Sequence, residues 1–161
     1  MVKVPVNDYR LFEEKSEYNL WTMTYTLQEI QTISPLTTQF AIDGKPNLGF
    51  ITVNVLEEEY LLWLVELTVA PAMENKGFGA HLLVAGMQVG LARGLSTVIG
   101  TFEPDRDARR VADWYRKRGF SIRGKDMRGD IQTVHDSCLA TMGEYNILVP
   151  LKNTLVEEYF P

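Results

Sequence analysis

The sequence predicts an α/β (α+β) fold, with a mixed, mostly antiparallel central sheet flanked by helices. Three observations lead to this class. The length of 161 residues fits one domain, expected here over residues 1–161. The middle of the chain carries consecutive alternating segments, which are typical of an antiparallel meander. The segments after it switch between helical and strand-like periodicity, which indicates helix–strand units added to that meander.

The first part of the chain gives a mixed pattern. Residues 1–6 alternate apolar and polar side chains, which favours a short strand, and residues 7–19 favour a capped helix. Residues 21–27 alternate with threonines and predict a strand, whereas residues 28–33 favour a helix. The element formed by this last stretch therefore stays open.

The meander follows. Turn-forming residues at Asp43–Asn47 and Glu57–Glu59 separate alternating segments, and Pro71 ends the last of them. That last segment is nearly all apolar, with Glu66 as its single charge, which predicts a strand buried on both faces. The predicted strands are residues 39–42, 48–56 and 60–69.

The second half alternates helices and strands. Apolar residues at three- and four-residue spacing predict helices, and short apolar runs predict strands. Residues 124–143 are polar and rich in turn-forming residues. The expected helices are residues 79–91 and 106–118, and the expected strands are residues 98–102, 120–123 and 145–151.

The composition excludes several classes of protein. A single cysteine, Cys138, excludes an internal disulfide framework and cysteine-rich zinc sites, and the distant His81 and His135 make a two-histidine metal site unexpected. No apolar signal segment follows the first residues, so we expect a reducing, cytoplasmic setting and no membrane partner.

Charge is unevenly distributed along the chain. The net charge is −5, yet residues 106–128 hold nine basic and three acidic side chains, net +6. Such a segment either meets a phosphate-bearing ligand or forms a solvated helix face. The acidic pI of about 5.1, without stacking or zinc-finger motifs, argues against a nucleic-acid partner.

The most informative motif lies between Val69 and Leu83. A strand ends at Pro71, a short loop leads to Gly77-Phe78-Gly79, and a helix begins there. The first turn of a helix presents unpaired N–H groups at its positive end, and glycine lets an anion approach the backbone. The pattern indicates a phosphate cradle, although by itself it also fits a plain strand-to-helix turn.

This segment resembles the acetyl-coenzyme A motif of the GNAT superfamily of N-acetyltransferases. The matching residues are Val69-Ala70-Pro71, Gly77-Phe78-Gly79 and the paired Leu82-Leu83. Glu74 departs from the family, which has glutamine or arginine there. An acid at this place adds repulsion near a pyrophosphate.

A second match lies in the next predicted helix. Tyr115, Gly119 and Phe120 fall in register with the family pattern, whereas Ala108 and Val111 replace its asparagine and alanine. Together the two motifs extend the resemblance over about residues 38–123.

The resemblance implies a sheet splayed between its fourth and fifth strands, with acetyl-coenzyme A as co-substrate in the gap and no metal. The main chain of Leu67 and Val69 would pair with the pantetheine arm, and an N–H on that strand would stabilise the oxyanion. N–H groups of Lys76 to Ala80 would hold the pyrophosphate. The implied cofactor-binding set is Leu67, Val69, Glu74, Asn75, Lys76, Gly77, Phe78, Gly79 and Ala80.

Two side chains are catalytic candidates. The acceptor amine must lose a proton, and Glu66 is the one charge on the adjoining strand, on the same face as Thr68. Tyr115 matches the family's general acid and would protonate the leaving thiolate. The alternatives are a structural carboxylate for Glu66 and a core tyrosine for Tyr115.

The predicted function is therefore transfer of an acetyl group from acetyl-coenzyme A to a primary amine of a small molecule or protein by direct attack. A GNAT fold that binds or regulates without catalysis is the alternative, supported by the departures at Glu74, Ala108 and Val111. A homodimer stays open. Residues 7–34 and 124–143 would shape the acceptor pocket, and the acidic N-terminal half either favours a cationic acceptor or forms a solvated surface.

Overall fold

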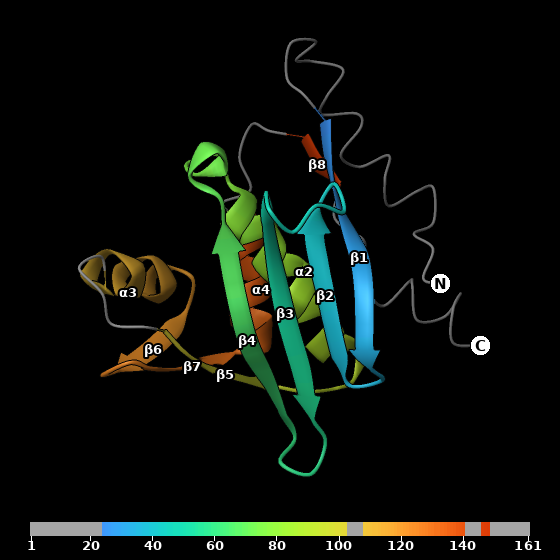
Figure 1. Ribbon diagram of the computed structural model, residues 1–161. Helices are drawn as coiled ribbons and strands as arrows, with labels where there is room; N and C mark the ends of the chain where they lie inside the picture. The colour runs from blue at the N-terminus through green and yellow to red at the C-terminus, as the bar shows by residue number, and fades with distance from the viewer. Residues whose placement is uncertain (1–23, 103–107, 141–145, 149–161) are drawn as a thin grey trace.

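The computed structural model describes residues 24–102, 108–140 and 146–148. Within these ranges an eight-stranded sheet runs in the order β6-β7-β5-β4-β3-β2-β1-β8 (Figure 1). The predictions for residues 1–19 lie outside the described residues. The elements are β1 (Thr24–Ser34), β2 (Thr37–Ile42), β3 (Gly49–Leu56), β4 (Leu61–Val69), a 3₁₀ turn (Pro71–Met73), α2 (Phe78–Ala92), β5 (Thr97–Thr101), α3 (Ala108–Lys117), β6 (Phe120–Arg123), β7 (Asp126–Asp130), α4 (Ile131–Ala140) and β8 (Asn146–Leu148).

The mixed α/β class with a mostly antiparallel sheet is confirmed. Strands β1 to β4 form the predicted meander, each antiparallel to the next. Two pairs are parallel, β4 with β5 and β1 with β8. The predicted helices over residues 79–91 and 106–118 correspond to α2 and α3, and the predicted strands over residues 98–102 and 120–123 correspond to β5 and β6.

Strand β1 decides an element that the sequence left open. Residues 28–33 belong to this strand, and the helix that their local pattern favours is wrong. Gln28 pairs with Ala41, and Ser34 pairs with Thr37 across a two-residue turn. Pairing with β2 outweighs the helical preference of a few glutamine and glutamate residues, because β-propensity depends on tertiary context.

Strand β4 corrects one expectation. Leu62 and Leu64 are buried, whereas Trp63 and Val65 are 40% and 39% exposed, so the strand is not buried on both faces. Helices α2 and α4 lie behind one face of the sheet, and in the described part of the chain no helix covers the face turned to the viewer (Figure 1). We call this second surface the open face.

Helix α2 forms the centre of the core. Nearly every side chain from Phe78 to Gly90 is buried, because the helix lies between the sheet and α4. Leu62 of β4 and Ile131 of α4 both approach Gly90 from outside the helix. This double contact explains why α2 is almost uniformly apolar instead of amphipathic.

The stretch after β6 holds more regular structure than its turn-rich composition indicates. Residues 124–143 contain β7, which pairs between β5 and β6, and the helix α4. Asp130 begins that helix by accepting hydrogen bonds from the backbone N–H of Thr133 at 3.0 Å and its hydroxyl at 2.8 Å. Strand β8 lies within the predicted residues 145–151.

Candidate active site

The sheet opens between β4 and β5. Their parallel pairing runs from Leu61–Thr97 to Leu64–Gly100 and goes no further in the described register. Strand β4 continues to Val69, where β3 is its one pairing partner among the described strands, whereas β5 ends at Thr101. The second half of β4 therefore borders a gap, which is the splay expected between the fourth and fifth strands.

Main-chain groups of β4 point into this gap. The N–H of Ala70 donates to the Leu48 carbonyl at 3.0 Å, on the side of β3. Successive residues of a strand direct their N–H and C=O groups to alternate sides. Thr68 therefore also faces β3, while Leu67 and Val69 present their main-chain groups to the gap.

A β-bulge interrupts β4 where the gap begins. Thr52 of β3 pairs with Glu66 and Val53 pairs with Leu64, so Val65 is the extra residue. Beyond the bulge Glu66 and Thr68 are exposed, and the Thr68 hydroxyl donates a hydrogen bond to Glu66 Oε2 at 3.1 Å. The two side chains share the open face, beside Thr52 and Gln39, whose own side chains are hydrogen-bonded at 2.9 Å.

The N-terminus of α2 closes one end of the gap. Gly77 is its N-cap in a left-handed conformation, with φ of 85°, which favours glycine. The buried His81 holds this turn, because its Nδ1 lies 2.6 Å from the Gly77 carbonyl. No side chain caps the helix and no acid lies in its first turn. In the described part of the chain no partner is seen for the N–H groups of Lys76, Gly77, Gly79 and Ala80.

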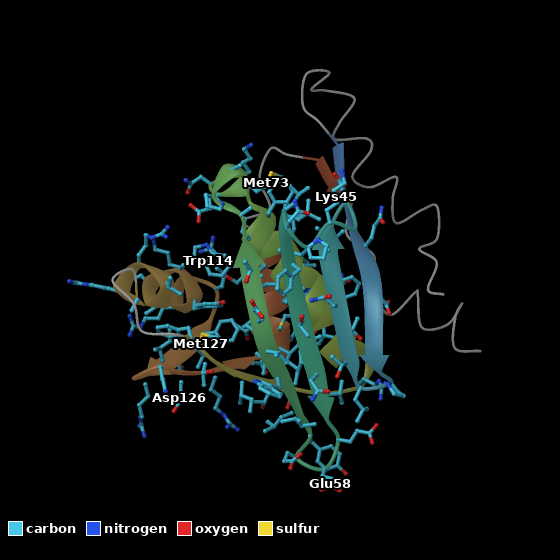
Figure 2. All side chains as sticks on the ribbon, viewed as in Figure 1. Lys45, Glu58, Met73, Trp114, Asp126 and Met127 are labelled. Carbon is cyan, nitrogen blue, oxygen red and sulfur yellow. The ribbon has the colours of Figure 1, made fainter. Side chains whose placement is uncertain are left out.

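Trp114 of α3 lies directly on this turn. A Cβ on Gly79 would stand 2.8 Å from Cζ2 of Trp114, so glycine is required there by the indole. The guanidinium group of Arg118 packs over this ring, with its carbon 4.2 Å from the ring centroid. Figure 2 shows Trp114 pointing away from α3 toward the rest of the fold. Packing between α2 and α3 is thus a sufficient reason for glycine at position 79, without an anion at the helix end.

Tyr115 sits beside Trp114 with its ring in the core. Its ring contacts Phe102, just beyond the end of β5, at 6.4 Å, and Phe120 at 5.3 Å between centroids. Burial raises the pKa of Tyr115 to about 12, so the phenol stays protonated near neutral pH. Tyr115 is only 8% exposed, and in the described ranges its hydroxyl makes no hydrogen bond.

The structure brings the sequence candidates to one region from separate elements. Glu66, Leu67 and Val69 come from the free half of β4, and the glycine motif lies at the start of α2. Tyr115 approaches from α3 on the side of β5, through its contact with Phe102. Glu74 and Asn75 are exposed on the loop between these elements.

Other reactive residues lie elsewhere. Cys138 is buried on α4, and burial raises the pKa of its thiol to about 12, which leaves little thiolate at neutral pH. His135 is hydrogen-bonded to its neighbour Asp136 at 3.1 Å. Across the described ranges no three histidine, cysteine or carboxylate side chains are placed to hold a metal ion. None of the described helices is long and apolar enough to cross a membrane.

Sequence patterns missed one feature of this region. A pocket of about 610 Å³ lies where β4, β5, β7 and β6 meet, and Trp63, Arg123 and Arg128 line it. These residues are separated by up to 65 positions, so no local motif joins them. The one available signal was the basic segment, and the sheet register that combines it with Trp63 depends on the fold.

Comparison with known proteins gives the family. The model of the acetyltransferase (GNAT) family matches residues 7–120. The chain belongs to the GNAT acetyltransferase family. No curated protein sequence matches it.

Solved structures of other proteins share the fold. Nourseothricin acetyltransferase superposes with a TM-score of 0.53 at 15% identity, over 69% of this chain and 86% of that chain. Tetrahymena GCN5 superposes with a TM-score of 0.50 at 14% identity, over 61% and 70%. At these identities the likeness concerns the arrangement of the elements.

The contact between Gly79 and Trp114 gives a first prediction. We expect Gly79→Ala to lower the free energy of unfolding by about 1–3 kcal/mol, because the added methyl group must displace a held indole. This loss runs against helix propensity, which favours alanine over glycine by about 1 kcal/mol. Urea unfolding measures it.

A double variant supplies the control. Trp114→Ala removes the obstacle, so adding Gly79→Ala to that background should cost nothing or stabilise the helix. If Gly79→Ala alone proves as stable as the wild type, the packing explanation is wrong.

Proposed function

We propose that this GNAT protein transfers an acetyl group from acetyl-coenzyme A to a primary amine of a small molecule or protein. The observation that carries the proposal is the gap between β4 and β5, which opens beside the uncapped N-terminus of α2. The gap offers main-chain partners for an extended amide-containing arm, and the helix end offers donors for phosphate oxygens.

The start of α2 suits a pyrophosphate. The N–H groups of Lys76, Gly77, Gly79 and Ala80 lie at the positive end of the helix dipole. Lys76 adds a positive charge close by. The exposed Glu74 is the one acidic residue of this loop, and its negative charge opposes that of Lys76. An anion here would be held by main-chain donors, which tolerate the departure at Glu74.

Strand β4 would orient the acyl end. Among the described residues the main-chain groups of Leu67 and Val69 on the gap side have no partner, so they could pair with the amides of the pantetheine arm. Acetyl-coenzyme A supplies a thioester. Its carbonyl oxygen gains negative charge as the amine nitrogen bonds to carbon, and loses that charge when the carbon–sulfur bond breaks and the thiolate leaves. An N–H of β4 at the bulge would stabilise that charge.

Two proton movements complete the reaction: the amine loses a proton and the sulfur gains one. Glu66 would accept the first, directly or through water, from the open face. Tyr115 would donate a hydrogen bond and a proton to the sulfur. Its raised pKa keeps the proton on the phenol until a charged partner arrives.

Release of free coenzyme A thiol tests the proposal. Purified protein with acetyl-coenzyme A and a panel of amines should release thiol faster than protein without amine, and mass spectrometry should find the acetylated amine. The assay is favourable here, since the buried Cys138 thiol, with its pKa raised to about 12, should not react with the reagent.

Coenzyme binding without amine-dependent thiol release would contradict the proposal. That outcome would favour the alternative of a GNAT-fold protein that binds or regulates. Calorimetry with acetyl-coenzyme A, run on the same preparation, separates this case from a protein that binds no coenzyme.

A further inference from the structure

The pocket on the open face is built from two neighbouring rows of the sheet. In the first row Trp63, Ile99, Arg128 and Ser121 are paired in order across β4, β5, β7 and β6. In the second row Thr101, Asp126 and Arg123 are paired across β5, β7 and β6. Side chains in register across a sheet share a face, so these residues converge on one side.

The helices lie on the opposite side of this part of the sheet. Asp126 and its neighbour Met127 point to opposite sides of the β6–β7 hairpin, with Met127 buried (Figure 2). The basic segment is therefore divided by the sheet. The cations of α3 lie on the helical side, whereas Arg123 and Arg128 face the pocket.

Arg123 and Arg128 are available to bind an anion. In the described part of the chain neither makes an ion pair or a side-chain hydrogen bond, unlike Arg93, Arg116 and Arg118. Asp126 is the one acid that lines the pocket, so two guanidinium groups face one carboxylate. The arginines are diagonal neighbours across the hairpin, about 7–8 Å apart at the backbone.

The opposite wall of the pocket is apolar. Trp63 is 40% exposed on β4, and Ile99 lies beside it on β5. An exposed indole on a strand offers a flat surface to an apolar group. The pocket thus combines two planar guanidinium donors, unpaired within the described residues, with an apolar wall. This combination recognises an anionic group attached to an apolar body.

The pocket also reaches the start of the gap. Gly100 and Thr101 line it, and Gly100 is the last residue of β5 paired with β4. The acidic turn Glu57–Glu59 lies at the other end of β4, where the strands are closed. The charged side chains on the open face in this region are therefore Arg123, Arg128, Asp126 and Glu66.

We propose that this pocket receives the acceptor, and that the acceptor is an amine carrying a carboxylate or phosphate group. Arg123 and Arg128 hold the anionic group, and Trp63 contacts the apolar part of the molecule. The proposal rests on the proposed acetyl transfer and adds the substrate class. Of the two interpretations of the acidic N-terminal half, it favours a solvated surface over a cationic acceptor.

Matched amine pairs test the proposal. L-phenylalanine carries a carboxylate that L-phenylalaninamide lacks. O-phosphoethanolamine carries a phosphate that ethanolamine lacks. In at least one pair the charged member should have a kcat/KM about tenfold higher or more, the effect of one charged hydrogen-bonded pair. The pair that shows this preference identifies whether the pocket binds a carboxylate or a phosphate.

Variants tie the preference to the pocket. Arg128→Gln and Arg123→Gln should each reduce it, and the double variant should abolish it. Lys125→Gln removes the same charge from the turn of the same hairpin, outside the pocket, and should leave it unchanged. Equal rates within both pairs, or a preference that survives the double variant, overturn the proposal.

A binding measurement separates this proposal from the proposed function. N-acetyl-L-phenylalanine and N-acetyl-L-phenylalaninamide are titrated into the protein without coenzyme, with O-phosphoethanolamine as the phosphate probe. If no amine supports thiol release but a charged probe binds in an Arg128-dependent manner, the acetyl transfer fails and the anion pocket stands. If neither charged probe binds, nor any amine shows an arginine-dependent preference, the pocket assignment is wrong.

Discussion

Replacing Tyr115 with phenylalanine is expected to lower kcat by about 10²-fold while leaving acetyl-coenzyme A affinity and stability nearly unchanged. The hydroxyl makes no hydrogen bond within the described residues, so its removal should cost the fold little. The buried ring, packed against Phe102, Trp114 and Phe120, is retained. Steady-state kinetics, calorimetry and thermal melting check the three parts.

Tyr60→Phe is the matched control. Tyr60 is 77% exposed in the turn before β4, so the same chemical change there should alter neither rate nor stability. A Tyr115→Phe protein with full turnover would remove Tyr115 from the mechanism. A large loss of stability would instead point to a structural role for the hydroxyl.

The same variant has a signature at high pH. The pKa of Tyr115 is raised above its ordinary value of 10 to about 12, so the folded state holds this proton more tightly than the unfolded state. The associated stability is present below pH 10 and is lost as the pH rises toward 12. Tyr115→Phe should lose less stability over this window than the wild type, in urea melts at each pH.

Glu66→Gln is the second large effect, with an expected fall in kcat/KM of about 10²-fold. Glutamine keeps the shape and the capacity to accept a hydrogen bond from Thr68, but it accepts no proton from the amine. Because Glu66 is exposed, stability should hardly change. The pH dependence of kcat/KM is the sharpest measurement, since the loss should shrink at high pH, where the free amine forms without a base.

Thr68→Val separates a base from a positioned structural carboxylate. The valine removes the 3.1 Å hydrogen bond to Glu66 and leaves the carboxylate in place. We expect a loss well below that of Glu66→Gln. Equal losses for the two variants, with parallel pH profiles, would show that Glu66 acts only through its local hydrogen bond.

Local pattern was sufficient to predict the elements with strong periodicity. The meander, α2, β5, α3 and β6 lie close to their predicted ranges because apolar spacing and turn residues agree there. The local pattern of residues 28–33 did not predict their strand, because their pairing with β2 is a tertiary effect. Helix α4 was missed although Ile131, Val134 and Cys138 repeat at helical spacing, since its polar remainder resembles a turn.

The candidate site likewise has a part that local sequence predicts and a part that depends on the fold. The loop motif lies in one continuous stretch, so its glycines and the following helix could be placed from the sequence. The bulge at Val65 is a matter of register with β3, which no local pattern encodes. The pocket depends on four strands brought together from distant positions, so its arginines gave only a local excess of positive charge.

The second half of β4 is in effect an edge strand inside a sheet. Within the described residues the main-chain groups of Leu67 and Val69 on the gap side are unpaired. They offer the template that open edges present to neighbouring chains, and edges of this kind promote aggregation. A ligand that fills the gap would cover that edge while it is bound. Such a ligand would then protect the protein against self-association.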